Sequence, residues 1–198
     1  VHIEKFIKFE NNKLVIDSNY YKVEPESSSA VQLKNVDFRY FNSEEDIFKN
    51  INLRIEKGKH TVITGPNGSG KSTLLGLLSQ IYYPQEGEIS IFTKNIGYVG
   101  VMPLIFDGSL RENLLYGNEN LKVDDKNLHD MLQLFRLFDE GNYNLDLAIS
   151  NRTLSSGQMQ KISFIRSLLS NTELLLLDES TSNLDSQTRD LIFNILKS

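Results

Sequence analysis

A glycine-rich stretch at residues 65–72 has the residue types and the spacing needed to bind phosphate. The stretch follows the pattern G-x-x-x-x-G-K-S and consists of Gly65, Pro66, Asn67, Gly68, Ser69, Gly70, Lys71 and Ser72. Glycines let a backbone close around a phosphate without side-chain clashes, and the N–H groups of such a loop can point toward the anion. In this pattern the lysine contacts the β- and γ-phosphates, and the serine hydroxyl binds Mg²⁺. The sequence therefore predicts a phosphate-binding loop, called the phosphate loop below.

The segments on both sides of the phosphate loop support this interpretation. Residues 60–64 form an apolar run typical of a buried strand, and residues 73–79 have the composition of a helix. A strand, the loop and a helix in this order are the context that the motif requires. The alternative is a glycine-rich turn in front of an ordinary helix.

A second set of chemically competent residues follows four consecutive leucines at residues 174–177. Such a run fits a parallel strand buried on both faces, and open α/β sheets bind ligands at the carboxyl ends of their strands. Asp178 and Glu179 come directly after it. Asp178 is placed to hold Mg²⁺, and Glu179 is placed to orient a water molecule or accept its proton.

Two further stretches are weaker signals. Ser155 and Gln158 form the capping pair S-x-x-Q at the start of an amphipathic helix,. The N-terminus of such a helix can bind an anion, but an ordinary capped helix fits equally well. Tyr40 ends a predicted strand, where its ring could stack on a base, and an exposed aromatic residue without a ligand is the alternative.

The rest of the chain indicates how these residues are positioned. Alternating apolar residues predict strands at 31–40 and 48–55, forming an antiparallel pair ahead of the nucleotide core,. Shorter strands are expected at 87–91 and 96–99. A capping box at Ser109 and Glu112 starts a helix, and residues 125–138 have one apolar face, with Gly141 able to end that helix. Residues 107–170 are therefore expected to be mainly helical, and another helix ends the chain. The predicted fold class is α/β.

Composition narrows the functional classes. The 198 residues carry a net charge of −5, which argues against non-specific nucleic-acid binding, and they include no cysteine for a disulfide or thiolate metal site,. Residues 1–30 are expected to be mostly a surface linker to another domain. The chain starts at Val1 and stops within a helical pattern, so we interpret it as a fragment of a longer protein, truncated at its C-terminus.

The order of phosphate loop, LSSGQ, LLLLDE and SNLD resembles the ATP-binding cassette (ABC) ATPases over residues 31–198. Residues 109–117, SLRENLLYG, resemble the exporter branch. The resemblance implies a P-loop NTPase (RecA-like) core with an N-terminal antiparallel β subdomain and an inserted α-helical subdomain at about 107–170. It also implies that residues 1–30 connect to a transmembrane domain, at the cytoplasmic face of a membrane.

The resemblance further implies ATP and Mg²⁺ as ligands and a second cassette as a head-to-tail partner. ATP would contact Tyr40, the phosphate loop and Thr73, while Ser72 and Asp178 would hold Mg²⁺. Glu179 would be the catalytic base, with Lys71 assisting catalysis. Ser155, Ser156, Gly157 and Gln158 would contact the partner's ATP, and Asp185 would belong to a loop across the dimer interface. LSSGQ, residues 154–158, is called the signature below.

Several features depart from the family pattern. Val101 occupies the position where exporters usually have a glutamine, and valine can neither ligate Mg²⁺ nor orient water. The stretch between Ile91 and Ile96 is shorter than usual, and Ser156 replaces the commoner glycine. The family's switch histidine would lie beyond Ser198. We therefore expect His2, His60 and His129 to be structural or surface residues.

Two other classes compete with an exporter ATPase. One is a soluble ABC protein acting on DNA or ribosomes, but the chain has no long coiled-coil insertion and is acidic. The other is an ATP-gated interaction module with little turnover. Because of Val101, this alternative stays open. Small-molecule P-loop kinases are disfavoured because they lack the signature and the Asp–Glu pair.

Overall fold

The computed structural model describes residues 7–10, 13–16, 21–118, 122–138 and 143–197, which fall into two compact units, Val1–Lys94 and Asn95–Ser198. The predicted linker, residues 1–30, lies partly outside the described residues. Within it, strand β1 (Ile7–Glu10) pairs antiparallel with β2 (Lys13–Ile16). The boundary between linker and domain at residue 31 stays a prediction.

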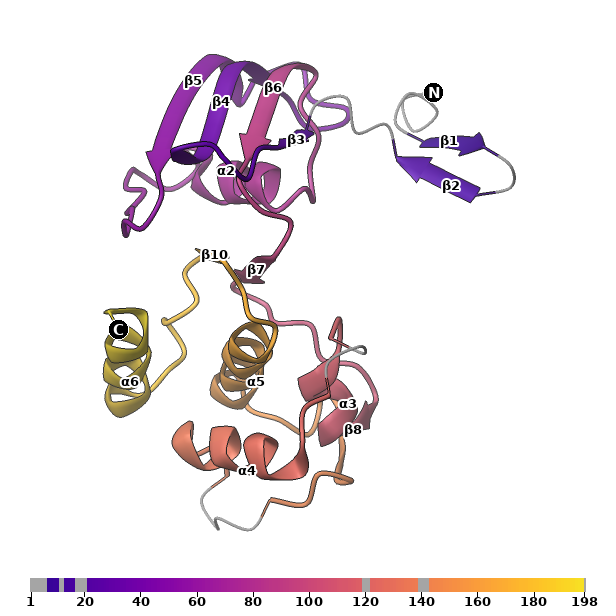
Figure 1. Ribbon diagram of the computed structural model, residues 1–198, viewed down its shortest axis with the longest axis vertical. Helices are drawn as coiled ribbons and strands as arrows, with labels where there is room; N and C mark the ends of the chain where they lie inside the picture. The colour runs from indigo at the N-terminus through magenta and orange to yellow at the C-terminus, as the bar shows by residue number, and fades with distance from the viewer. Residues whose placement is uncertain (1–6, 11–12, 17–20, 119–121, 139–142, 198) are drawn as a thin grey trace. The chain divides into compact units, whose positions relative to one another are not determined.

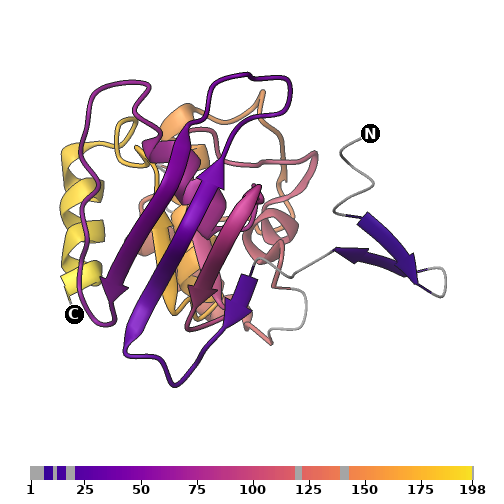
Figure 2. The same ribbon diagram turned by 90° about the horizontal axis from the view of Figure 1, so that it is seen from above.

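The first unit is built on a four-stranded sheet in the order β3-β6-β4-β5 (Figure 2). Its strands are β3 (Tyr21–Val23), β4 (Ser29–Phe38), β5 (Phe48–Glu56) and β6 (Glu86–Ile91). Strand β4 pairs antiparallel with β5 and with β6, and β3 pairs parallel with β6. The antiparallel pair predicted at residues 31–40 and 48–55 is confirmed.

Strand β4 shows how the sequence fixes this sheet. Its apolar side chains Val31, Leu33, Val36 and Phe38 are all buried, although the spacing changes from two residues to three after Leu33. The pairing with β5 shifts register at the same place. A bulge that adds one residue to a strand returns the next apolar side chain to the buried face. The irregular spacing therefore still produces one apolar face.

Helix α2 (Lys71–Leu78) covers this sheet and begins where the phosphate loop ends (Figure 1). The prediction of a buried strand at residues 60–64 is wrong. These residues have no regular secondary structure, and Val62 is 81% exposed. The run is apolar enough for a strand. However, a strand exists only where a neighbour pairs with it, and none of the described strands pairs with residues 60–64,.

The second unit contains two parallel strands and a group of helices (Figure 1). Strand β7 (Ile96–Val99) pairs parallel with β10 (Leu174–Leu177), and β8 (Gly108–Ser109) pairs with β9 (Ala148–Ile149). The helices are α3 (Leu110–Leu115), α4 (Asp125–Leu134), α5 (Ser156–Leu169) and α6 (Ser186–Lys197). The predicted helices in 107–170 and at the end of the chain are confirmed. Leu110, Leu128 and Ile162 lie in one hydrophobic core.

Two details of the second unit differ from the predictions. Strand β10 is not buried on both faces, because Leu176 is buried and the other three leucines are half-buried. Among the described strands it pairs with β7 alone, and a two-stranded sheet offers less cover than a wide one,. Helix α4 ends at Leu134 rather than at Phe138. Arg136 adopts a left-handed conformation with φ 46°, and the Leu137 N–H donates to the Leu132 carbonyl, which terminates the helix before Gly141, a residue outside the described ones,.

No helix among the described residues is long and apolar enough to cross a membrane.

Candidate functional site

The phosphate loop has the backbone geometry that anion binding requires. Gly68 and Gly70 have φ values of 80° and 89°, which only glycine adopts without strain,. Gly70 is also the N-cap of α2, and no side chain caps the helix there. The first N–H groups of an α-helix have no partners within the helix, and they carry a positive partial charge. The start of α2 therefore fits a phosphate group.

Lys71 shows where the charge of that anion would be neutralised. Its ammonium donates to the carbonyls of Gly65 and Pro66 at 3.1 and 2.9 Å. Both partners are neutral oxygens, and phosphate oxygens would accept stronger, charge-assisted bonds from the same ammonium. A Cβ at Gly65 would lie 2.8 Å from the Ser69 Oγ, so a side chain there would require the Ser69 hydroxyl to move.

Tyr40, the predicted base-stacking residue, lies beside the start of α2. Its hydroxyl is 2.6 Å from the Thr73 Oγ1, which joins two residues predicted to contact ATP. Tyr40 as a whole is 39% exposed, and its ring meets the rings of Phe38 and Tyr82 edge-on, at centroid distances of 5.1 and 5.4 Å. The geometry leaves part of the ring accessible, and base stacking stays a prediction.

The two carboxylates lie at the carboxyl end of β10, in the second unit. Asp178 is buried, accepts a 3.1 Å hydrogen bond from the Tyr98 hydroxyl, and its N–H donates to the Val99 carbonyl at 2.9 Å. Glu179 is exposed and adopts φ 47°, a left-handed conformation that costs a non-glycine residue about 1–2 kcal/mol,. The Ser182 hydroxyl donates to the Glu179 carbonyl at 3.0 Å and stabilises this turn. Backbone strain at a candidate catalytic base is typical of functional sites.

The signature forms the N-terminus of α5, and the predicted capping pair is confirmed. The Ser155 Oγ accepts from the Gln158 N–H at 3.2 Å, and the Gln158 Oε1 accepts from the Ser155 N–H at 2.8 Å. A Cβ at Gly157 would lie 2.9 Å from the Asn183 carbonyl oxygen. The signature therefore contacts the loop that leads to Asp185, and only a residue without a side chain fits there.

Asp185 has a capping role that the sequence analysis missed. Its carboxylate accepts from the Thr188 N–H at 2.8 Å and from the Thr188 hydroxyl at 2.7 Å, and it lies 3.3 Å from the Lys161 ammonium. These bonds, led by the Thr188 N–H, hold the pKa of Asp185 well below its usual range. The spacing D-x-x-T ahead of an amphipathic run was the signal that could have predicted the cap. Its place in a dimer interface stays a prediction.

A second missed residue, Gln160 on α5, contacts the loop after β7. Val101 is 44% exposed, and the preceding Gly100 carbonyl accepts a 3.0 Å hydrogen bond from the Gln160 Nε2. Gln160 is 1% exposed, and among the described residues its Oε1 is a buried side-chain oxygen without a hydrogen-bond partner. The short connection between β6 and β7 is seen as expected, from Ile91 to Ile96.

The histidines have no catalytic geometry in the described part of the chain. His129 lies on α4, and its ring nitrogens are 2.6 Å from the Asp125 carbonyl and 3.0 Å from the Tyr143 carbonyl, which is a structural role. His60 is exposed, and His2 lies outside the described residues. Within the described residues, no three His, Cys, Asp or Glu side chains form a metal-binding group. A Mg²⁺ site made by one carboxylate, one hydroxyl and phosphate oxygens needs no such group.

The structure thus brings the predicted residues together in two sets. The first unit contains the phosphate loop, Tyr40 and Thr73. The second contains the signature, Asp178, Glu179 and Asp185. The parts that these residues play in ATP binding and hydrolysis stay predictions.

Comparison with known proteins gives consistent matches. The family model described as ABC transporter matches residues 48–182. ABC transporter B family member 22 from Arabidopsis thaliana is 33% identical in an alignment that covers 89% of this chain and 17% of that protein. The ATP-dependent permease MDL1 from Candida albicans is 34% identical, covering 91% of this chain and 29% of the permease. A solved structure of a bacterial Atm1-family ABC exporter with ATP bound matches with a TM-score of 0.77 and 25% identity, covering 90% of this chain and 34% of that one.

The structural match confirms the predicted α/β P-loop fold. The chain spans less than a third of the length of one permease and about a sixth of the Arabidopsis relative.

Proposed function

Because the chain belongs to the ABC transporter family, we propose that it is a nucleotide-binding domain that binds and hydrolyses ATP to power export across a membrane. The observation that carries the proposal is the match over residues 48–182. That segment contains, in this order along the chain, the phosphate loop, the signature and both carboxylates. ATPase activity is general in this family, and the turnover of this chain and its coupling to transport belong to the proposal.

In the proposed site, the first unit binds the nucleotide. The start of α2 and the phosphate loop bind the phosphates through backbone N–H groups, and Lys71 exchanges its carbonyl partners for phosphate oxygens,. Tyr40 stacks on the adenine. Thr73 lies in the first turn of α2, and its hydroxyl hydrogen-bonds with that of Tyr40. It therefore contacts the nucleotide between the base and the terminal phosphate.

The second unit supplies the groups for hydrolysis. Asp178 of this unit and Ser72 of the first unit are each hard oxygen donors of the kind that suits Mg²⁺,. When bound, Mg²⁺ would neutralise charge on the phosphate oxygens. Glu179, exposed on its strained turn, orients the attacking water and accepts its proton,. The buried Asp178 keeps its orientation through Tyr98 and the β7 backbone.

We propose two protein partners: a second nucleotide-binding domain, paired head to tail, and the transmembrane domain of the same transporter. The exposed tip of α5 with Ser155 and Ser156 supports the first, because a helix N-terminus can donate to the partner's ATP,. The exposed apolar side chains after β7, with Met102 90% exposed, support a docking surface for the second,. The chain would then act at the cytoplasmic face of the membrane, without nucleic acid.

The alternative function is an ATP-gated interaction module with little turnover. Val101 favours it, because its exposed side chain has no polar atom to bind Mg²⁺ or water. ATP binding and pairing with the second nucleotide-binding domain would then occur without efficient hydrolysis.

Hydrolysis by the complete protein tests the proposal, comparing wild type with Glu179→Gln. We expect Glu179→Gln to bind ATP as wild type does but to hydrolyse it about 10²–10⁴-fold more slowly, the usual contribution of a general base. Glu173→Gln, an exposed carboxylate near the opposite end of β10, is the matched control and should keep its rate. A Glu179→Gln protein that retains more than a tenth of the wild-type rate would contradict the assigned role.

A further inference from the structure

The ring that is expected to stack on the base is held by a second tyrosine, Tyr82, which no motif singled out. Tyr82 follows α2 and is half-buried. Its ring lies 5.4 Å from the Tyr40 ring with an interplanar angle of 89°, and 5.6 Å from the Phe38 ring at 33°. Perpendicular aromatic contacts of this kind are favourable beyond the area that they bury. Tyr82 and Phe38 therefore both contact the Tyr40 ring, and together they restrict its orientation.

Tyr82 is itself fixed on several sides. A Cβ at Gly76 would lie 2.5 Å from the Tyr82 ring carbons, so the ring packs directly on the backbone of α2. The Tyr82 N–H donates to the Gly76 carbonyl at 3.1 Å. The Tyr82 carbonyl and the Leu77 carbonyl each lie 2.6 Å from the Tyr21 hydroxyl, which belongs to β3. A residue held in this way can transmit a fixed orientation to its neighbour.

The phosphate-binding groups lie at the other end of α2. The glycines of the phosphate loop precede the helix and Lys71 is its first residue, whereas Gly76 lies near its end and Tyr82 follows it. Tyr82 reaches the predicted nucleotide site through its contact with Tyr40. A change at Tyr82 should therefore affect the base and leave the phosphates alone.

We propose that Tyr82 is a positioning residue for nucleobase recognition, which orients the Tyr40 ring so that the base finds a preformed stacking surface. This inference rests on the proposed function, because it requires Tyr40 to stack on adenine. It predicts that part of the ATP affinity depends on Tyr82 through the base alone. Inorganic tripolyphosphate, which has the phosphates but no base, is the probe that separates the two contributions.

The experiment measures the dissociation constants of ATP and of tripolyphosphate, each with Mg²⁺, for the chain and its variants. We expect Tyr82→Leu to weaken ATP binding about two- to tenfold, the range of one aromatic contact, and to leave tripolyphosphate binding unchanged. Tyr82→Phe keeps the ring contact and should bind ATP more tightly than Tyr82→Leu does. Tyr83→Leu removes the adjacent tyrosine, which contacts the Tyr21 ring at 5.6 Å, and should change neither ligand.

A double-mutant cycle strengthens the test, because Tyr82→Leu should cost nothing further in a Tyr40→Leu background. If Tyr82→Leu does not fold, Tyr82→Met replaces it, because methionine fills more of the space next to Gly76. The same two dissociation constants then decide. Unchanged ATP affinity without the ring would overturn the proposal, and so would equal losses for ATP and tripolyphosphate. If the wild-type chain binds neither ligand, the proposed function itself fails.

Discussion

Lys71 and Asp178, two charged residues with roles in the proposed chemistry, are held in contrasting ways. The Lys71 ammonium is bound by two neutral carbonyls of its own loop, while the buried Asp178 carboxylate accepts from the Tyr98 hydroxyl. Exchanging carbonyls for phosphate oxygens strengthens the bonds of Lys71. A buried carboxylate gains from a cation beside it. A bound phosphate would therefore strengthen the contacts of Lys71, and a bound cation would stabilise Asp178.

Val101 is the residue that most directly sets the expected rate. Its side chain offers neither donor nor acceptor, so we expect the attacking water to lack a polar link to the rest of the second unit. Loss of one polar group from a phosphoryl-transfer site reduces catalysis through positioning and electrostatics, not through nucleotide binding. We expect near-normal ATP affinity, slow single-turnover hydrolysis in the complete protein, and partial recovery in Val101→Gln.

The control for this prediction is Met102→Gln, which places the same amide one residue further along and should not raise the rate. A wild-type protein that already turns over at about 1 s⁻¹ or faster, with no change in Val101→Gln, would show that Val101 is no defect.

Asp185 gives a prediction about pH. Its pKa is lowered in the folded state, first by the Thr188 N–H and then by the Thr188 hydroxyl and Lys161. A carboxyl group with a depressed folded pKa contributes stability above its unfolded pKa, about 4, and loses that contribution as the pH falls through the folded value. Asp185→Asn should therefore lower the melting temperature at pH 7 and reduce its dependence on pH below about 4.

Melting curves between pH 2 and 7 check this expectation, with Asp190→Asn on the same helix as the control. Parallel curves for wild type and Asp185→Asn would contradict it.

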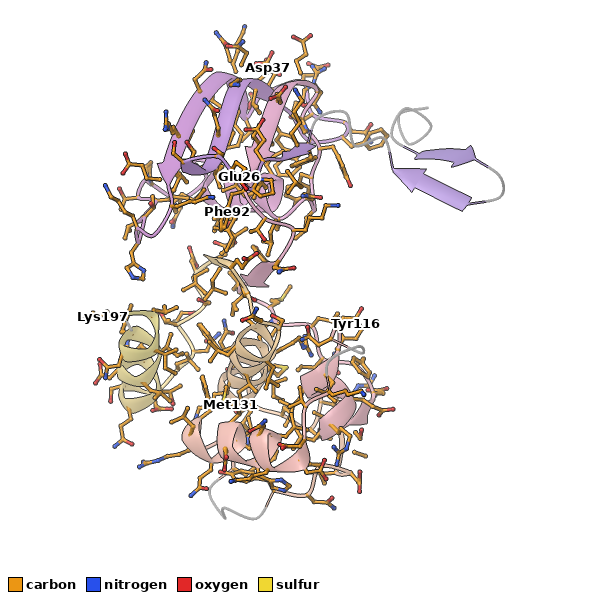
Figure 3. All side chains as sticks on the ribbon, viewed as in Figure 1. Glu26, Asp37, Phe92, Tyr116, Met131 and Lys197 are labelled. Carbon is orange, nitrogen blue, oxygen red and sulfur yellow. The ribbon has the colours of Figure 1, made fainter. Side chains whose placement is uncertain are left out.

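Among the elements, α5 connects most of the second unit's candidate residues. Its N-terminus carries the signature, Gln160 bonds to the Gly100 carbonyl beside Val101, and Lys161 contacts Asp185. Arg166 donates to the carbonyls of Asn113 and Leu104, which attaches α3 and the loop before it. Tyr116, labelled beside α3 in Figure 3, lies under the Arg166 guanidinium at 5.3 Å. A shift of this helix would therefore move several candidate groups together.

Gly157 tests how tightly the tip of this element is packed. Alanine normally stabilises a helix relative to glycine by about 1 kcal/mol. At Gly157, however, the added Cβ would lie 2.9 Å from a backbone oxygen, so either α5 or the loop at Asn183 must shift. We expect Gly157→Ala to lower the melting temperature of the nucleotide-free chain, while Ser156→Ala, at the exposed neighbouring position, leaves it nearly unchanged. A melting temperature for Gly157→Ala at or above that of wild type would show that the contact is loose.

At the scale of the whole molecule, most elements could be predicted because local patterns specify them. Alternation predicted β4 and β5, and capping pairs predicted the starts of α3 and α5. The strand at residues 60–64 could not be settled in this way, because a strand depends on a partner that its own residues do not specify. The same limit applies to Gln160 and Tyr82, whose roles come from contacts between residues distant in sequence.

The candidate site was predicted unevenly for a related reason. The phosphate loop and the Asp–Glu pair have side chains whose chemistry is visible in the sequence. Asp185 was assigned to an interface by resemblance, while its hydrogen bonds to Thr188 show a second, structural role at the start of α6.

The most direct test of the central claim is the melting temperature of the chain with and without millimolar ATP and Mg²⁺. A ligand that binds only the native state stabilises it by about 2.7 kcal/mol at a hundred times its dissociation constant, or about 5–10 °C for a chain of this size. We predict such an increase for wild type and its near absence in Lys71→Ala, which removes the ammonium from the phosphate loop. An unchanged wild-type melting temperature, or an equal increase in Lys71→Ala, would contradict the account.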